Sequence, residues 1–174
     1  MQTRTVYGGN LFNVEVKSWT DARGRGISRE IVRHPGAVVI VPALDRDRLV
    51  MIRNHRVAVD EELLELPAGK LEPGEESARA AERELEEETG YAAGAIAPLG
   101  EFYTSPGLTD ELMRAFVASD LRPVGQRLEA GERIRVEIMD RAEVMRRIDG
   151  GEIRDGKTIA ALMLWQRRMD GGRP

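Results

Sequence analysis

The chain contains no cysteine, and aromatic residues make up only 5% of its 174 residues. The absence of cysteine excludes disulfides, thiolate zinc sites and cysteine nucleophiles. No apolar run approaches the roughly 18 residues that a membrane span requires. The first ten residues, MQTRTVYGGN, lack the apolar core of an export signal. We therefore expect a cytoplasmic protein that does not enter a membrane.

Positive charge is not in excess either, because 26 Lys and Arg stand against 30 Asp and Glu, a net charge of −4. A protein that binds nucleic acid broadly needs a basic face to neutralise phosphates, so we expect no nucleic-acid partner. Hydrophobic residues make up 41% of the chain and charged residues 32%. This composition is typical of a folded protein with a real core, and the length fits one domain with a small appendage.

Hydrophobic periodicity predicts strands at both ends of one central helix. Strand-like segments, alternating or continuously apolar, cover Leu11–Trp19, Ile27–His34, Ala37–Val41, Arg48–Arg53, Ala95–Thr104, Leu112–Ala118 and Arg133–Met139. Helical segments cover Glu76–Thr89, Arg141–Ile148 and Lys157–Met169. The order of strands, helix, strands and two helices predicts an α+β fold.

Acidic residues are concentrated in one segment, because eight of the 30 lie between Glu72 and Glu88. On a helix Glu84, Glu87 and Glu88 project from one face, since they are three or four positions apart. A solvated acidic face is the alternative interpretation, but arginine is nearly absent from this face, so pairing four residues apart does not neutralise it. Without cysteine and with two histidines, a metal site would use oxygen ligands, which suit Mg²⁺, Mn²⁺ or Ca²⁺.

The same segment also has the residue spacing of a known motif. From Gly69 to Tyr91 the sequence reads GKLEPGEESARAAERELEEETGY. It resembles the Nudix box: glycine, five residues, glutamate, seven residues, then Arg-Glu-aliphatic-any-Glu-Glu-any-Gly. The fixed positions are filled by Gly69, Glu75, Arg83, Glu84, Leu85, Glu87, Glu88 and Gly90. The sequence departs only at Tyr91, where an aliphatic residue is usual.

The resemblance implies the Nudix fold, a mixed β-sheet between helices, and metal-dependent hydrolysis of a nucleoside diphosphate linked to another group. A bound cation would neutralise the pyrophosphate and activate a water molecule. The implied ligands of Mg²⁺ or Mn²⁺ are the backbone carbonyl of Ala68 and the catalytic carboxylates Glu84, Glu87 and Glu88. Structural roles are implied for Gly69, Glu75, Arg83 and Gly90, with an ion pair between Arg83 and Glu75.

A second segment resembles one subgroup of the family. Thr104–Glu111 reads TSPGLTDE and places Pro106 sixteen residues after Gly90, a pattern similar to that of the ADP-ribose pyrophosphatases. The resemblance implies hydrolysis of ADP-ribose to AMP and ribose 5-phosphate. The implied substrate-binding residues are Arg29, Arg56 and Glu111, with Arg29 reaching the adenine from a partner subunit. Phe12 and Trp19 are candidates for stacking on adenine, although each is equally a core candidate.

The subgroup takes its catalytic base from a mobile loop beyond the Nudix box. Here residues 128–136 read LEAGERIRV, and Glu132 matches that base better than Glu129 does. Gly125 and Gly131 favour a flexible loop, as expected of a lid that closes over substrate. We therefore expect Glu132 to be the general base, with Glu129 as the alternative.

The subgroup also implies a homodimer, because its N-terminal strands exchange between subunits. We expect residues 1–34 to form a strand extension for dimerisation and substrate contact, residues 35–170 the Nudix domain, and residues 171–174 a tail. Another substrate, GDP-mannose or ADP-glucose, is the alternative within the family. A nucleotide-binding sensor without catalytic activity is the alternative outside enzymes, although such proteins usually lack part of the glutamate set.

Overall fold

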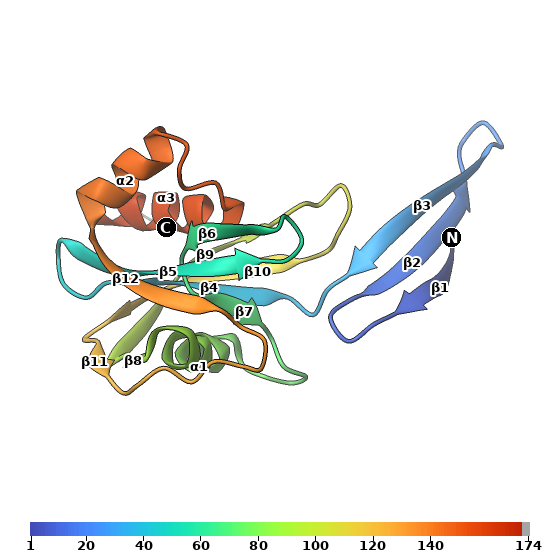
Figure 1. The fold of residues 1–174 in the computed structure, drawn as a ribbon. Helices are drawn as coiled ribbons and strands as arrows, with labels where there is room; N and C mark the ends of the chain where they lie inside the picture. Colours follow the sequence, from blue (N-terminus) through green and yellow to red (C-terminus); the bar gives the residue numbers. More distant parts are fainter. Residues whose placement is uncertain (172–174) are drawn as a thin grey trace.

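Two central sheets and three helices form the body of the protein in the computed structural model, which describes residues 1–171 (Figure 1). The mixed sheet contains β7 (Ala68–Lys70), β4 (Ala37–Pro42), β10 (Leu112–Ser119) and β9 (Ala95–Tyr103), in that order, with β4 and β10 parallel. The antiparallel sheet contains β12 (Ile134–Asp140), β5 (Arg48–Arg56) and β6 (Glu61–Glu65). The short strands β8 (Tyr91–Ala92) and β11 (Arg122–Pro123) pair with each other.

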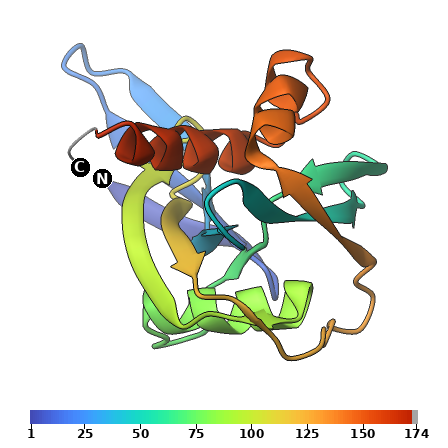
Figure 2. The same cartoon turned by 90° about the vertical axis from the view of Figure 1, so that its left-hand side faces the viewer.

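The helices lie on opposite sides of these sheets (Figures 1 and 2). Helix α1 (Ser77–Thr89) covers one side, whereas α2 (Arg141–Asp149) and α3 (Gly156–Met169) cover the other. The predicted α+β architecture, with sheets between helices, is therefore confirmed. No helix within residues 1–171 is long and apolar enough to cross a membrane.

Strand β4 shows how the sequence builds this layered core, because all six of its residues are buried. Side chains alternate between the two faces of a strand, so Val38 and Ile40 pack on the side of α1. Val39 and Val41 pack instead in the cluster that contains Trp165 of α3 and Val144 of α2. A continuously apolar strand is what a sheet covered on both faces requires.

The predicted helices agree with the structure to within one residue at each end. Asp140 occupies the N-cap position of α2, but its side chain makes no capping hydrogen bond. In α3, Leu162 and Trp165 are buried whereas Met169 is exposed. The predicted tail, residues 171–174, lies outside the described residues except for Gly171.

A separate antiparallel sheet at the N-terminus stands apart from the body (Figure 1). It contains β1 (Gln2–Gly8), β2 (Asn13–Thr20) and β3 (Gly26–Arg33). The strands β2 and β3 correspond to two of the predicted strand segments, and they pair as an antiparallel hairpin. The strand β1 was not predicted, because all its residues are exposed and no hydrophobic pattern marks it. Arg33 joins this sheet to the body through an ion pair with Asp110 (2.6 Å), and Val32 donates to the carbonyl of Leu108 (3.0 Å).

Candidate active site

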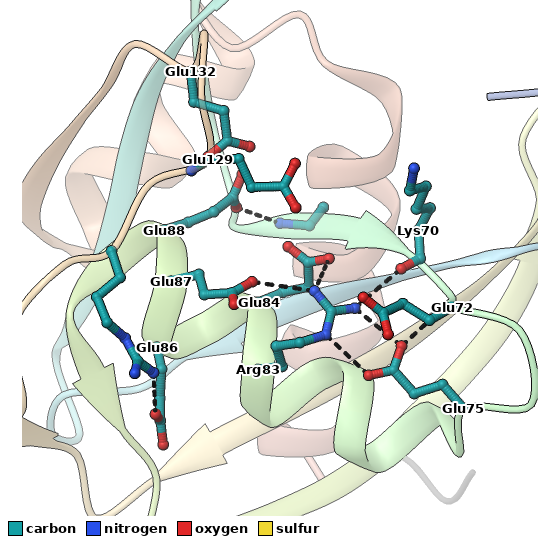
Figure 3. Close-up of polar contacts among 12 residues, drawn as sticks. Lys70, Glu72, Glu75, Arg83, Glu84, Glu86, Glu87, Glu88, Glu129 and Glu132 are labelled. Atoms are coloured by element: carbon teal, nitrogen blue, oxygen red, sulfur yellow. Dashed lines mark hydrogen bonds and ion pairs between the residues drawn. The ribbon is translucent and has the colours of Figure 1, made fainter. Parts of the chain in front are cut away.

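The carboxylates of α1 lie at the end of the helix that approaches β7. Glu84 and Glu88 are buried at the helix–sheet boundary, with exposed fractions of 9% and 3%. Glu88 accepts a hydrogen bond from the backbone N–H of Ala68 (2.8 Å), the first residue of β7 (Figure 3). Gly90 ends the helix in the left-handed conformation (φ 72°), and its N–H bonds the carbonyl of Glu86. Glycine is the residue that adopts this conformation without steric cost.

Gly69 permits the close approach of β7 to α1. A Cβ atom built on Gly69 would overlap the carboxyl group of Glu84. The backbone of β7 therefore reaches the Glu84 carboxylate only because residue 69 has no side chain. The sequence assigned Gly69 a conformational role, and the structure identifies its physical reason as the space beside Glu84.

Arg83 is the centre of a charged network around these carboxylates (Figure 3). Its guanidinium forms the expected ion pair with Glu75, through bonds of 2.9 and 3.0 Å. It also donates to Glu84 (2.7 Å) and Glu87 (3.2 Å). The sequence interpretation that arginine leaves the acidic face unpaired is therefore wrong, because Arg83 and Glu87 are an ion pair four residues apart.

Burial makes the carboxyl groups of Glu84 and Glu88 hard to ionise. The pKa of Glu88 is raised to about 8, mainly by burial and in smaller part by the charges of Glu84 and Glu132, while the hydrogen bond from Ala68 and the charge of Arg56 oppose the rise. Burial also raises the pKa of Glu84, although its ion pair with Arg83 opposes the shift. Carboxylates held in this way gain from a positive charge placed between them.

The donor set fits a hard cation, but the carboxylates are not gathered around one point. Within residues 1–171 no group of three or more His, Asp or Glu side chains is arranged to hold a metal ion. Glu88 is bonded to Ala68, and Glu84 to Arg83. Oxygen donors with raised pKa values are suited to Mg²⁺ or Mn²⁺. Binding would require the side chains to exchange these partners for the ion.

A cavity of about 540 Å³ opens in front of these carboxylates. Of the predicted site residues, it is lined by Arg56, Ala68, Gly69, Arg83, Glu84, Glu88, Glu111 and Glu132, and also by the alternative base Glu129. Glu87 is not part of this lining among the described residues; it faces Arg83. The structure thus brings together most of the residues that the sequence singled out.

The N-terminal candidates lie elsewhere. Arg29 is on the exposed β3 strand, where it donates to the carbonyl of Ser28 (2.7 Å). Phe12 lines a second cavity of about 680 Å³, beside Arg33 and Lys70. Trp19 is 38% exposed on the separate sheet. Within one chain, the cavity lined by the carboxylates therefore receives neither Arg29 nor these aromatic residues.

The loop between β11 and β12 carries the two candidate bases to the cavity. Its first half is fixed to the end of α1, because Gln126 donates to the carbonyl of Glu88 (2.6 Å) and Arg127 to that of Glu87 (3.0 Å). In its second half the Glu132 carboxylate accepts from the N–H of Glu129 (2.8 Å). The charge of Glu132 raises the pKa of Glu88, so this carboxylate is electrostatically coupled to the α1 cluster.

The cavity is also lined by a charged group that the sequence interpretation missed. Glu65 of β6 has no exposed surface, and it accepts from Arg56 (2.6 and 2.9 Å) and from Lys157 Nζ (2.6 Å). Lys157 also donates to Asp155 (2.8 Å). A single glutamate within the otherwise apolar segment Leu63–Leu66 was the available signal, because a buried carboxylate needs a cationic partner.

Comparisons with known proteins identify a matching family, related sequences and a similar structure. The NUDIX domain family model matches residues 33–162. An ADP-ribose pyrophosphatase of Bacillus subtilis (strain 168) is 36% identical over 163 residues, which cover 92% of this chain and 88% of that protein. A GDP-mannose pyrophosphatase of Citrobacter koseri is 34% identical over 76% of this chain and 78% of its own length. The crystal structure of an ADP compounds hydrolase superposes with a TM-score of 0.85 at 27% identity, over 98% of this chain and 93% of that one.

Proposed function

The chain belongs to the NUDIX family, and from this premise we propose that it hydrolyses ADP-ribose to AMP and ribose 5-phosphate with Mg²⁺ or Mn²⁺. One observation carries the proposal: the α1 carboxylates Glu84 and Glu88 line a single cavity together with Arg56. A diphosphate needs cations on its oxygens and a base for the attacking water. The names of the relatives support ADP-ribose as the substrate.

Each residue has a distinct task in this proposal. Mg²⁺ or Mn²⁺, when bound by Glu84, Glu87, Glu88 and the Ala68 carbonyl, supplies charge neutralisation and lowers the pKa of a water molecule. Arg56 binds a phosphate oxygen, because a guanidinium presents donors in a planar fork. Glu132 accepts the proton of the water that attacks phosphorus, while the bridging P–O bond breaks. Glu111 accepts a hydrogen bond from the terminal ribose.

We assign a supporting role to the Thr104–Glu111 segment. Thr104 donates from its hydroxyl to Glu111 (2.6 Å), and His34 Nδ1 lies 3.7 Å from the same carboxylate. These contacts hold Glu111 at the wall of the cavity. A carboxylate fixed in this way can accept hydrogen bonds from the hydroxyls of a sugar.

The extension supports a proposal of a homodimer. The sheet of β1–β3 exposes Val6, Tyr7, Leu11 and Trp19 and stands apart from the body (Figure 1). A small exposed sheet with apolar side chains is a typical protein contact. In the dimer Arg29 would reach the cavity of the partner subunit. R29A and E88Q should each be inactive alone, and mixing their subunits should restore turnover in the mixed dimer. A mixture as inactive as the two separate variants would contradict this role of Arg29.

The experiment that tests the proposed function compares substrates. Purified protein with Mg²⁺ is incubated separately with ADP-ribose, ADP-glucose and GDP-mannose, and the products are separated by anion-exchange chromatography. We expect AMP and ribose 5-phosphate in equal amounts, no product with EDTA, and the highest kcat/KM for ADP-ribose. Because GDP-mannose pyrophosphatases are among the relatives, GDP-mannose is the second candidate. A tenfold higher kcat/KM for GDP-mannose than for ADP-ribose would make GDP-mannose the substrate. Binding of these compounds without cleavage would indicate a sensor.

A further inference from the structure

One part of the cavity wall contains a chain of alternating charges. Arg56, Glu65, Lys157 and Asp155 follow one another through hydrogen bonds of 2.6 to 2.9 Å. All four residues line the cavity. We propose, building on the proposed function, that Glu65 and Lys157 are positioning residues that make Arg56 an effective ligand of the substrate diphosphate.

Glu65 fixes the direction of the Arg56 guanidinium. Its carboxylate has no exposed surface and accepts from Nε (2.9 Å) and Nη2 (2.6 Å) of Arg56. A two-point contact of this kind holds the plane of the guanidinium. The Arg56 side chain remains 39% exposed, so its other edge can meet a ligand. The cost of this arrangement is that Glu65 cancels much of the positive charge that a phosphate would feel.

Lys157 removes that cost. Its ammonium group donates to the same Glu65 oxygen (2.6 Å) that Arg56 Nη2 contacts. The lining of the cavity holds eight carboxylates and only four Lys or Arg side chains. Without Lys157, the charges of Glu65 and Asp155 would outweigh that of Arg56, and the wall would repel a diphosphate.

The N-terminus of α3 holds this arrangement in place. Asp155 caps the helix by accepting from the N–H (3.0 Å) and the hydroxyl (2.5 Å) of Thr158. The Thr158 hydroxyl accepts in turn from the N–H of Leu66 (2.9 Å), two residues before Ala68. The helix N-terminus also favours the negative charge of Asp155. Lys157 is therefore fixed by the same contacts that join α3 to the floor of the cavity.

The test is a rescue by compensating charge. K157M removes one positive charge, and E65Q in the same chain removes one negative charge, so the double variant regains the net charge of the wild type. The matched control is K70M, which removes a lysine that lines the same cavity but makes no hydrogen bond to Glu65 within the described residues. K157R keeps both the charge and the ability to contact Glu65.

Two measurements are made on each variant: kcat and KM for ADP-ribose with Mg²⁺, and the Kd for ADP-ribose in EDTA by calorimetry. For K157M we expect KM and Kd to rise about tenfold, the scale of one charge-assisted contact, with kcat changed less than threefold. We expect K157R to stay near the wild type. We expect E65Q/K157M to recover part of the loss, because the double change restores the net charge but the glutamine accepts only one of the two Arg56 hydrogen bonds. Circular dichroism and Tm identify any variant that fails to fold. If K157M does not fold, the affinities of K157R and E65Q/K157M for ADP-ribose test the proposed role of Lys157.

Three outcomes would overturn the inference: an unchanged Kd in K157M, no rescue in E65Q/K157M, or an equal loss in K70M. Absence of any rescue would mean that the net charge of this part of the wall does not control binding. No binding by the wild type in EDTA would also overturn it, because Arg56 would then hold no phosphate. If the wild type binds but does not cleave ADP-ribose, the proposed function fails. The Kd values of the variants in EDTA would still test the roles of Glu65 and Lys157.

Discussion

Replacing Glu88 with glutamine should stabilise the metal-free protein while it abolishes turnover. Glu88 is 3% exposed, and burial raises its pKa to about 8. The ordinary value for the unfolded chain is 4.5. Between these two values the folded protein keeps a proton that the unfolded chain releases. The stability of the folded protein therefore falls as pH rises from 4.5 to about 8, and above 8 it carries the whole cost of a buried charge.

The size of this effect follows from the shift. The difference between 4.5 and about 8 in the pKa of Glu88, at about 1.4 kcal/mol for each change of one in pKa, gives an upper limit of about 5 kcal/mol. The glutamine of E88Q has the size of the protonated carboxyl group and can accept the same hydrogen bond from Ala68. The free energy of unfolding of E88Q therefore does not contain the decrease with pH that ionisation of Glu88 causes in the wild type. We expect E88Q to exceed the wild type by several kcal/mol at pH 8.5, and by much less at pH 5.

Urea denaturation in EDTA at pH 5, 7 and 8.5 measures these free energies of unfolding. The matched control is E82Q, which makes the same change at a half-exposed position of α1. Saturating Mg²⁺ should narrow the difference at pH 8.5, because the cation stabilises the ionised Glu88 carboxylate of the wild type. A wild type as stable as E88Q at pH 8.5, or a difference that does not grow with pH, would refute the account of Glu88 as a buried, destabilised ligand.

Other predictions concern neighbouring residues. G69A should lower Mg²⁺ affinity at least tenfold by calorimetry, since the new methyl group displaces the Glu84 carboxylate; unchanged affinity would contradict the close approach. E132Q should lower kcat more than a hundredfold with Mg²⁺ affinity retained, and the same result for E129Q alone would transfer the role of base to Glu129. R83K should lower the Tm by several degrees, because lysine cannot make the two-point contact with the Glu75 carboxylate; an unchanged Tm would show that this contact adds no stability.

The layered body was predictable because its elements carry strong local patterns. The continuously apolar β4 segment indicated a sheet covered on both sides, and the alanine-rich, glutamate-rich α1 segment ended at Gly90 as expected. The strand β1 lacked such a signal, since its residues are stabilised by pairing with β2 rather than by burial. Short strands such as β7 also escaped prediction because they are defined by their sheet partners.

The candidate site was predictable where a motif fixes residue types at set distances along one helix. The Nudix box located Glu84, Glu87 and Glu88, and it related Arg83 to Glu75. It could not locate Glu65 and Lys157, which are 92 residues apart and meet only where the N-terminus of α3 approaches the end of β6. The contact of Gly69 with Glu84 was hidden for the same reason: close approach between elements is a property of the folded chain.

Cleavage of the diphosphate should depend on a cation held by the α1 carboxylates. Mn²⁺ is titrated into the wild type, E84Q and E88Q, binding is monitored by electron paramagnetic resonance, and ADP-ribose turnover is measured on the same samples. We expect both variants to lose Mn²⁺ affinity and turnover together while remaining folded. Full Mn²⁺ affinity or near-normal turnover in E88Q would show that the α1 carboxylates do not hold this cation.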